Sequence, residues 1–209
     1  MFSKLYSDPR THGNYNIVFL LTGGGKFNYQ GSKKWLEDQL DNLDGTIIQV
    51  STSRYTTYED EYAAFQDASY IMCLDTLLAN DAIYMHVSKP PKEGSPTSIF
   101  LKELKSIAES SGTAITIEGV HKKINLAEDL LAWEHERFSI RRLPAFTLSA
   151  FKNHKDFSRG TILDVGENIN LEKLHQVTKI IAEALAAQIY NISATGEIFQ
   201  NTTVSLVVI

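Results

Sequence analysis

Short apolar runs alternate with stretches of helical periodicity along most of the chain. Runs rich in β-branched and aromatic residues, bounded by glycine or polar turns, predict strands. They lie at residues 15–21, 69–75, 82–87, 113–120 and 143–149, and residues 45–50 are a weaker candidate. Apolar positions three or four apart predict helices over residues 32–43, 96–110 and 171–190. Asn125-Leu-Ala-Glu128 has the form of a capping box, which predicts another helix to about Arg137.

The order of these elements predicts the fold class. Strands that alternate with helices indicate an α/β fold of three layers, with a mixed, mostly parallel sheet and helices on both faces. The run at residues 15–21 is apolar at nearly every position, so we expect this strand to be buried on both sides. Residues 1–192 are expected to form one partial domain with an irregular excursion at residues 51–67. Residues 193–209 are expected to form a tail, apolar and β-branched from residue 202.

Composition narrows the function classes. Apolar residues make up 43% of the chain and charged residues 22%, with a net charge of -5, as expected for a folded domain of ordinary composition. Nucleic-acid binding needs a basic surface, because neutralising phosphates supplies most of the affinity. Neither the net charge nor any stripe of lysine and arginine provides such a surface, so nucleic acid is excluded as a partner.

Compartment signals are few. The single cysteine, Cys73, lies in an apolar run, which predicts a buried thiol and no internal disulfide. The first residues do not resemble a signal peptide, and no apolar stretch approaches the roughly 18 residues that a membrane span requires. Asn191 and Asn201 begin Asn-x-Ser/Thr tripeptides, which are candidate glycosylation sites if the chain reaches the secretory lumen.

Two phosphate-binding motifs can be rejected at the glycine-rich turn that begins at Thr22. A Walker loop requires glycine six places before the lysine and Ser or Thr after it, but Leu20 and Phe27 occupy those positions around Lys26. A dinucleotide fingerprint would require a third glycine at Asn28. Nucleophilic catalysis has no better support, since Cys73 is set in an apolar run and the chain contains no Gly-x-Ser-x-Gly elbow.

A zinc-binding helix is also rejected. The string Trp133-Glu-His-Glu-Arg137 would need a second histidine four residues after His135, where Ser139 stands. We therefore interpret the string as alternating charge on an exposed helix face. No pair among the six histidines has the close spacing typical of metal ligands.

Longer strings carry a family resemblance. Residues 19–37 (FLLTGGGKFNYQGSKKWLE) and 124–149 (INLAEDLLAWEHERFSIRRLPAFTLS) resemble the nicalin family, as do residues 73–76 and 87–94. The nicalins are distant, non-catalytic relatives of the dizinc aminopeptidases. The resemblance implies a zinc-aminopeptidase-like fold. It also implies that this chain begins inside the parent domain and is truncated at both ends.

Aligning the chain with the aminopeptidase motif implies that the catalytic groups are missing. The glutamate that serves as general base in those enzymes falls on Gly25, and the neighbouring zinc-binding glutamate falls on Lys26. Asp75 matches an aspartate ligand, whereas the last histidine ligand falls on Gly160. The remaining ligands would lie before Met1. The resemblance therefore implies a chain without catalytic residues, metal or cofactor, in which Lys26, Asp75 and Gly160 are vestigial positions.

The function implied by the resemblance is that of a binding scaffold. Nicalins are subunits of the BOS complex, which implies a lumenal endoplasmic-reticulum location, with nodal modulator and a polytopic membrane protein as partners beside the translocon. The implied role is the insertion and assembly of multi-pass membrane proteins, without a small-molecule substrate.

Two alternatives stay open at this point. The chain could be a zinc-dependent exopeptidase with relocated ligands, for which Asp75, His135 and His154 are the candidates. It could also be a piece with no role of its own, because missing opening strands would leave sheet edges unpaired and prone to aggregation.

Overall fold

A mixed four-stranded sheet forms the centre of the protein. The computed structural model describes residues 17–40, 68–77, 81–156, 159 and 170–192. The described strands lie in the order β1-β4-β2-β3. Their bounds are Ile71–Asp75 for β1, Ala82–Val87 for β2, Thr116–His121 for β3 and Ala145–Ser149 for β4.

Two parallel pairs of strands meet at one antiparallel junction. β1 runs parallel to β4, and β2 runs parallel to β3. β2 and β4 run antiparallel, with Met85 opposite Leu148. The prediction of an α/β fold with a mixed sheet is therefore confirmed.

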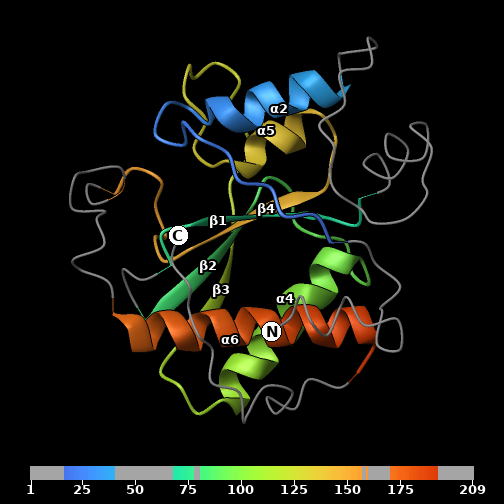
Figure 1. The fold of residues 1–209 in the computed structure, drawn as a ribbon, viewed down its shortest axis with the longest axis vertical. Coiled ribbons are helices and arrows are strands. Elements are labelled where there is room, and N and C mark those ends of the chain that lie inside the picture. Colours follow the sequence, from blue (N-terminus) through green and yellow to red (C-terminus); the bar gives the residue numbers. More distant parts are fainter. Residues whose placement is uncertain (1–16, 41–67, 78–80, 157–158, 160–169, 193–209) are drawn as a thin grey trace.

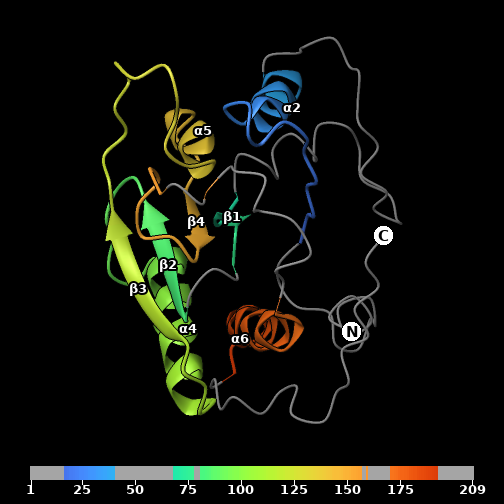
Figure 2. The same cartoon turned by 90° about the vertical axis from the view of Figure 1, so that its left-hand side faces the viewer.

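Helices cover both faces of this sheet, as Figures 1 and 2 show. α2 and α5 lie over one face, and α4 and α6 lie over the other. The bounds are Gln30–Leu40 for α2, Pro96–Ser110 for α4, His135–Ile140 for α5 and Leu171–Tyr190 for α6. The predicted three-layer arrangement is thus present in the described part of the chain. None of the described helices combines the length and the apolar composition that a membrane span requires.

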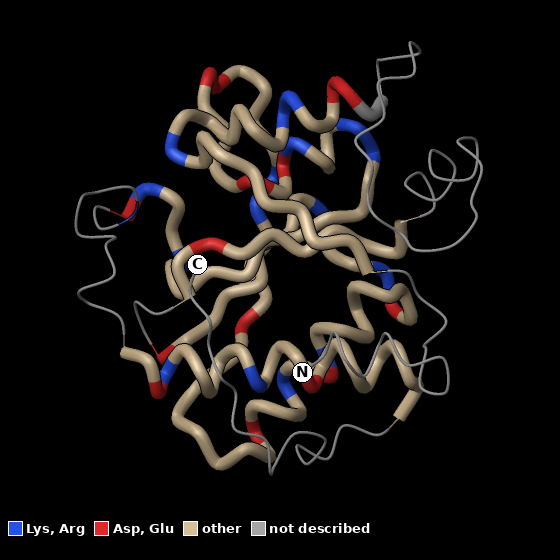
Figure 3. Tube along the Cα trace, viewed as in Figure 1, with Lys and Arg blue, Asp and Glu red and all other residues tan. Residues whose placement is uncertain are grey.

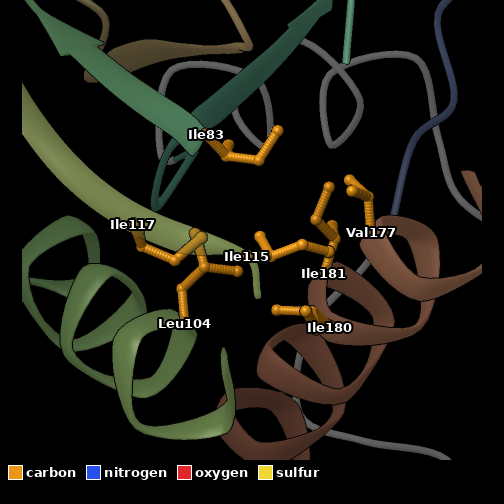
Figure 4. Close-up of a pocket in the computed structure, with 7 residues that line it drawn as sticks. All are labelled: Ile83, Leu104, Ile115, Ile117, Val177, Ile180 and Ile181. Atoms are coloured by element: carbon orange, nitrogen blue, oxygen red, sulfur yellow. The ribbon is translucent and has the colours of Figure 1, made fainter. Parts of the chain in front are cut away.

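The larger apolar core lies between the sheet and the α4–α6 pair. Phe100 and Leu104 of α4 are fully buried there, as is Phe146 of β4, and the Phe100 and Phe146 rings lie 5.4 Å apart. Burying a side chain of this size contributes roughly 1.5–3 kcal/mol. Figure 4 shows seven aliphatic side chains converging in this core around a gap that has no room for a water molecule. They are Ile83, Leu104, Ile115, Ile117, Val177, Ile180 and Ile181.

A smaller apolar cluster fixes the opposite layer. Leu36 of α2 and Phe138 of α5 pack with Cys73 of β1. The Trp35 and Phe138 rings lie 6.4 Å apart and tie the two helices together. This cluster confirms that Cys73 is buried, and it positions the turn before α2 above the end of β1.

Local signals in the sequence explain the ends of the long helices. Ser95 accepts a hydrogen bond from the Ser98 amide at 3.3 Å, and Pro96 occupies the first turn of α4. Gly112 takes a φ of +65°, the left-handed conformation that terminates many helices. Asn170 caps α6 by accepting from the Lys173 amide at 3.0 Å.

Two predicted elements are wrong. Residues 17–22 form no strand in the described structure, and Phe19 and Leu21 expose 78% and 98% of their surface. No packed layer covers these side chains there, so the burial that the apolar run predicted is missing. The predicted helix from Asn125 is also absent, because the Asn125 Oδ1 atom accepts from the Ala127 amide at 3.1 Å and closes a turn.

Three further predictions lie outside the described residues. They are the weak strand at residues 45–50, the excursion at residues 51–67 and the tail at residues 193–209.

Candidate functional site at the ends of β1 and β4

Polar side chains meet where β1 and β4 end. Asp75 and Ser149 are the last residues of these parallel strands and lie opposite each other in register. Ser149 Oγ donates to Asp75 Oδ2 at 3.2 Å, and the Phe151 amide donates to Ser149 Oγ at 3.1 Å. Carboxyl ends of parallel strands are common sites for ligands, so this edge is the first place to look for chemistry.

Arg159 occupies the space in front of Asp75. Its Nε atom donates to Asp75 Oδ2 at 3.0 Å, and Nη1 donates to the carbonyl oxygen of Ala132 at 3.0 Å. Nη2 donates to the hydroxyl of Tyr29, and the guanidinium carbon lies 4.3 Å from the centre of the Trp133 ring. One cation thus joins β1, the turn before α2 and the loop before α5.

Burial and charge act in opposite directions on this cation. Burial alone would lower the pKa of Arg159, but the Asp75 carboxylate and the Tyr29 hydroxyl together raise it. Burial also raises the pKa of Tyr29, although the neighbouring Arg159 opposes that effect. Arg159 is therefore a permanent positive charge, and Tyr29 stays protonated at neutral pH.

The glycine-rich turn supplies the third side of the site. Its backbone is closed by hydrogen bonds from Phe27 N to Gly24 O at 3.0 Å and from Gly31 N to Gly23 O at 3.1 Å. A Cβ at Gly31 would overlap the Gly23 carbonyl oxygen and lie 2.8 Å from Thr22 Cβ, so no other residue fits there. Gly25 and Lys26 are exposed on the outside of this turn.

Glu134 connects the glycine-rich turn to α5. Its Oε1 atom accepts a hydrogen bond from Ser32 Oγ and another from Thr22 Oγ1 at 3.4 Å. Ser32 is buried at the start of α2. The carboxylate therefore serves as an acceptor for two hydroxyl groups rather than as an exposed charge.

A buried polar layer lies beside this site. The His86 ring stacks on Trp133 with centroids 3.8 Å apart, and His86 Nε2 donates to the Phe151 carbonyl oxygen at 2.8 Å. His135 Nδ1 hydrogen-bonds to Thr147 Oγ1 at 2.9 Å, next to His86 in the sheet. Burial lowers the pKa of His86 to about 4 and that of His135 to about 3. Both imidazoles are neutral at physiological pH.

This layer contradicts the prediction of an exposed, charged helix face at residues 133–137. Trp133, His135 and Glu136 are each 1% exposed. Glu136 Oε2 accepts from the Ala132 amide at 3.1 Å, and burial raises the pKa of this carboxyl group. The prediction failed because α5 begins only at His135 and the side chains find partners far away in the sequence, Trp133 on β2 and His135 on β4, which a local pattern cannot indicate.

The sequence-derived candidates separate into two sets. Asp75 belongs to the site, whereas Gly160 lies outside the described residues. His154 contacts Arg159 through its main-chain oxygen at 3.4 Å, and His135 is directed at Thr147. Within the described residues no group of three or more His, Cys, Asp or Glu side chains could hold a metal ion. The described residues therefore do not fit a zinc centre.

Arg159, Tyr29 and Glu134 are the site residues that the sequence did not indicate. Arg159 follows Asp75 by a long stretch of chain, and nothing in the spacing connects the two. The only available signal for Tyr29 was its place in the glycine-rich turn. These residues define the class of protein: an α/β domain whose strand-end site is organised around an arginine.

Comparison with known proteins identifies homologues of this chain. The chain is 46% identical, over 94% of its length, to a dog protein named BOS complex subunit NCLN. A zebrafish protein named BOS complex subunit ncln is also 46% identical over 94% of the chain. A Caenorhabditis elegans protein named Nicalin is 32% identical over 94% of the chain. No family model matches.

The chain is a homologue of nicalin. It spans about a third of the length of these relatives, 32% of the dog protein and 34% of the worm protein. The predicted resemblance to the nicalins is confirmed.

Proposed function

We propose that this chain is a non-catalytic, aminopeptidase-like scaffold that works as part of a BOS complex subunit. The relatives' names carry the assignment to that complex. The observation that carries the non-catalytic part is the contact between Arg159 and Asp75. A metal ion and a guanidinium would compete for the same carboxylate, and here the guanidinium has it at 3.0 Å.

The neighbouring positions support the same conclusion. A general base at Gly25 would need a side chain, and the turn has space for one, since nothing lies within 4 Å of a Cβ built there. Crowding of the turn therefore does not account for the absence of a carboxylate at this position. Lys26 next to it cannot ligate zinc while it is protonated.

The cellular setting is part of the proposal. We place the protein at the endoplasmic-reticulum membrane, on the lumenal side, with nodal modulator and a polytopic membrane protein as partners near the translocon. There it would assist the insertion and assembly of multi-pass membrane proteins. Asn191 is exposed at the C-terminal end of α6, where its backbone is left-handed with φ +50°, and is a glycosylation candidate. Asn201, the second candidate, lies outside the described residues.

Metal content and peptidase activity test the non-catalytic part. The purified protein is dialysed against zinc, its metal content is measured by mass spectrometry, and it is assayed with leucyl and aspartyl fluorogenic peptides. We expect no stoichiometric zinc and no hydrolysis above background. Bound zinc at one or two equivalents, with turnover that a chelator abolishes, would instead establish the zinc exopeptidase with relocated ligands.

Co-isolation tests the assignment to the complex. A tagged copy of the protein is recovered from membranes solubilised in mild detergent, and the bound proteins are identified. We expect the other BOS complex subunits at near-stoichiometric amounts. Their absence would contradict the proposed assembly.

A further inference from the structure

Three large apolar side chains are exposed on two loops beside the arginine site. Phe27 lies in the turn before α2 and is 77% exposed, while Leu126 and Leu130, in the loop between β3 and α5, are 77% and 68% exposed. We call these three residues the rim patch. Large apolar side chains gathered at one place on a surface commonly mark an interaction site.

Hydrogen bonds fasten the two loops to each other. The side-chain amide of Asn28 donates to the Asp129 carbonyl oxygen at 2.9 Å, and its oxygen accepts from the Leu131 amide at 2.9 Å. These contacts immediately flank Leu130 on one loop and adjoin Phe27 on the other. The rim patch is therefore contributed by loops that are joined directly, although they are far apart in the sequence.

The same loops are also tied to the arginine site. Tyr29 donates from its hydroxyl to the Ala132 carbonyl oxygen at 3.1 Å, and Arg159 donates to that oxygen at 3.0 Å. Arg137 Nη2 donates to the Asn28 carbonyl oxygen at 2.6 Å. The arginine site thus holds in place the loops that carry the rim patch.

Backbone strain in the turn indicates that this arrangement is imposed by its surroundings. Asn28 and Tyr29 have φ values of +56° and +55°, a left-handed conformation that L-residues rarely adopt. Such strain persists only where surrounding contacts over-determine the backbone, and it is frequent at ligand-binding sites. A surface fixed before binding loses little entropy when a partner docks.

The charges around the rim patch indicate the kind of partner. Lys26 adjoins Phe27, while Glu128 and Asp129 lie between the two leucines, and all three charged residues are exposed. Figure 3 shows acidic and basic positions together at this end of the molecule. Anionic lipids and nucleic acids both bind to positively charged surfaces. An apolar centre surrounded by polar residues, here with charges of both signs, is typical of a protein interface.

We propose that the rim patch docks a protein, which presents apolar side chains to Phe27 and Leu130 and charges of both signs to Lys26 and the Glu128–Asp129 pair. The inference rests on the proposed function, because the partner is another subunit of the same complex. The arginine site then has a purpose in this chain: it holds the docking surface in its binding conformation.

Paired substitutions test this docking surface. The variant Phe27→Ser with Leu130→Ser removes the exposed apolar centre and leaves the hydrogen bonds of Asn28 in place. The matched control is Leu171→Ser on α6, which is 68% exposed like Leu130 and lies on the other side of the sheet. Each tagged protein is isolated from detergent-solubilised membranes, and the recovery of the other BOS complex subunits is measured. We expect the recovery of these subunits to fall at least about tenfold with the paired variant and to match the wild-type value with the control.

A charge variant tests the same surface independently of the paired substitution. Asp129→Lys leaves the main-chain contact to Asn28 unchanged and reverses a rim charge, so recovery of the subunits should fall at least about threefold. This variant decides the question if the paired variant proves to be unfolded. The proposal is overturned if the charge variant, or a paired variant that is folded, recovers the other subunits as well as the wild-type protein does.

Other occupants of the rim patch are separate outcomes. Self-association of the wild-type protein in analytical ultracentrifugation that the paired variant abolishes would assign the surface to a second copy. Sedimentation with phosphatidylserine vesicles that the paired variant abolishes would assign it to a membrane, and either result overturns the inference. If the wild-type protein recovers no subunits, the proposed function itself fails. If the wild-type protein and the variants recover the subunits equally well, only the proposed docking surface fails.

Discussion

Arg159 donates from Nε to Oδ2 of Asp75 at 3.0 Å, joining a residue in the loop after β4 to the last residue of β1. The two side chains are 16% and 26% exposed, so water screens the pair only partly. The same guanidinium also reaches Tyr29 and Ala132. This one side chain therefore connects β1, the turn before α2 and the loop before α5.

Replacement of Arg159 should destabilise the fold. Arg159→Gln leaves the Asp75 carboxylate without its cation and removes hydrogen bonds from Tyr29 and Ala132. We expect the free energy of unfolding to fall by about 2 kcal/mol, less than for a fully buried ion pair because water reaches this one. Urea unfolding followed by circular dichroism measures the change. Lys152→Gln, which breaks an exposed pair with Glu118, is the control and should cost less than about 0.5 kcal/mol.

Stability should decrease as the pH falls below about 6.5. Burial holds the pKa of His86 at about 4 and that of His135 at about 3 in the folded protein, whereas both titrate near 6.5 when unfolded. Between these values the unfolded chain binds more protons, so acid favours unfolding. We expect the titration of each histidine to lower the free energy of unfolding by roughly 2 kcal/mol at pH 5 relative to neutral pH.

A substitution separates the contribution of one histidine. His135→Gln can still hydrogen-bond to Thr147 but takes up no proton. The slope of unfolding free energy against pH between 5 and 6 should therefore decrease by about one proton, or roughly 1.4 kcal/mol per pH unit. An unchanged slope would mean that His135 is not the titrating group. Groups facing His86, which include Asp75, Arg159 and His154, are left intact by this variant.

Two glycines, Gly25 in the turn and Gly31 at the start of α2, should respond differently to substitution by alanine. At Gly31 the new Cβ would overlap the Gly23 carbonyl oxygen, so the backbone must move at the start of α2. We expect Gly31→Ala to cost about 1–3 kcal/mol. Gly25→Ala meets nothing within 4 Å and should change stability by less than about 0.5 kcal/mol. Thermal unfolding of the two variants side by side gives the comparison, and equal losses would contradict the described turn.

The single thiol should react only when the fold opens. Cys73 is buried in β1 beneath α2 and α5, and burial raises its pKa well above the usual value. We expect a thiol-specific disulfide reagent to modify native protein slowly and urea-unfolded protein at once, at least about a hundredfold faster. Rapid modification of native protein would show that the layer formed by α2 and α5 is detached from β1 in solution.

The sequence predicted those parts of the fold that local patterns specify. β2 at Ala82–Val87, α4 at Pro96–Ser110 and α6 at Leu171–Tyr190 have the bounds that the hydrophobic pattern predicted. Each carries its own signal, such as the continuous apolar stripe that runs along α6. The residues at 17–22 show the limit of such signals, because an apolar run becomes a buried strand only if other elements cover it.

The candidate site was predicted only in part, for a related reason. Asp75 could be found because it ends a recognisable strand. Arg159 could not be found, because its role depends on a contact with Asp75, which lies 84 residues earlier in the sequence. Trp133 and His135 were assigned to an exposed face, although His86 and Thr147 on neighbouring strands supply their partners. Contacts of this kind arise from tertiary packing, which a single local pattern does not contain.

The register of the sheet also has a consequence for how the domain assembles. Ala82 pairs with Thr116 across a crossover formed by α4, whereas Ile71 pairs with Ala145, about twice as far along the chain. Closing the longer loop costs more chain entropy, and distant pairings form more slowly. We therefore expect β2, α4 and β3 to form an early folding unit and β1 to join later. The two loops that carry the rim patch would then reach their final conformation last, so a partner would bind only chains that have completed folding.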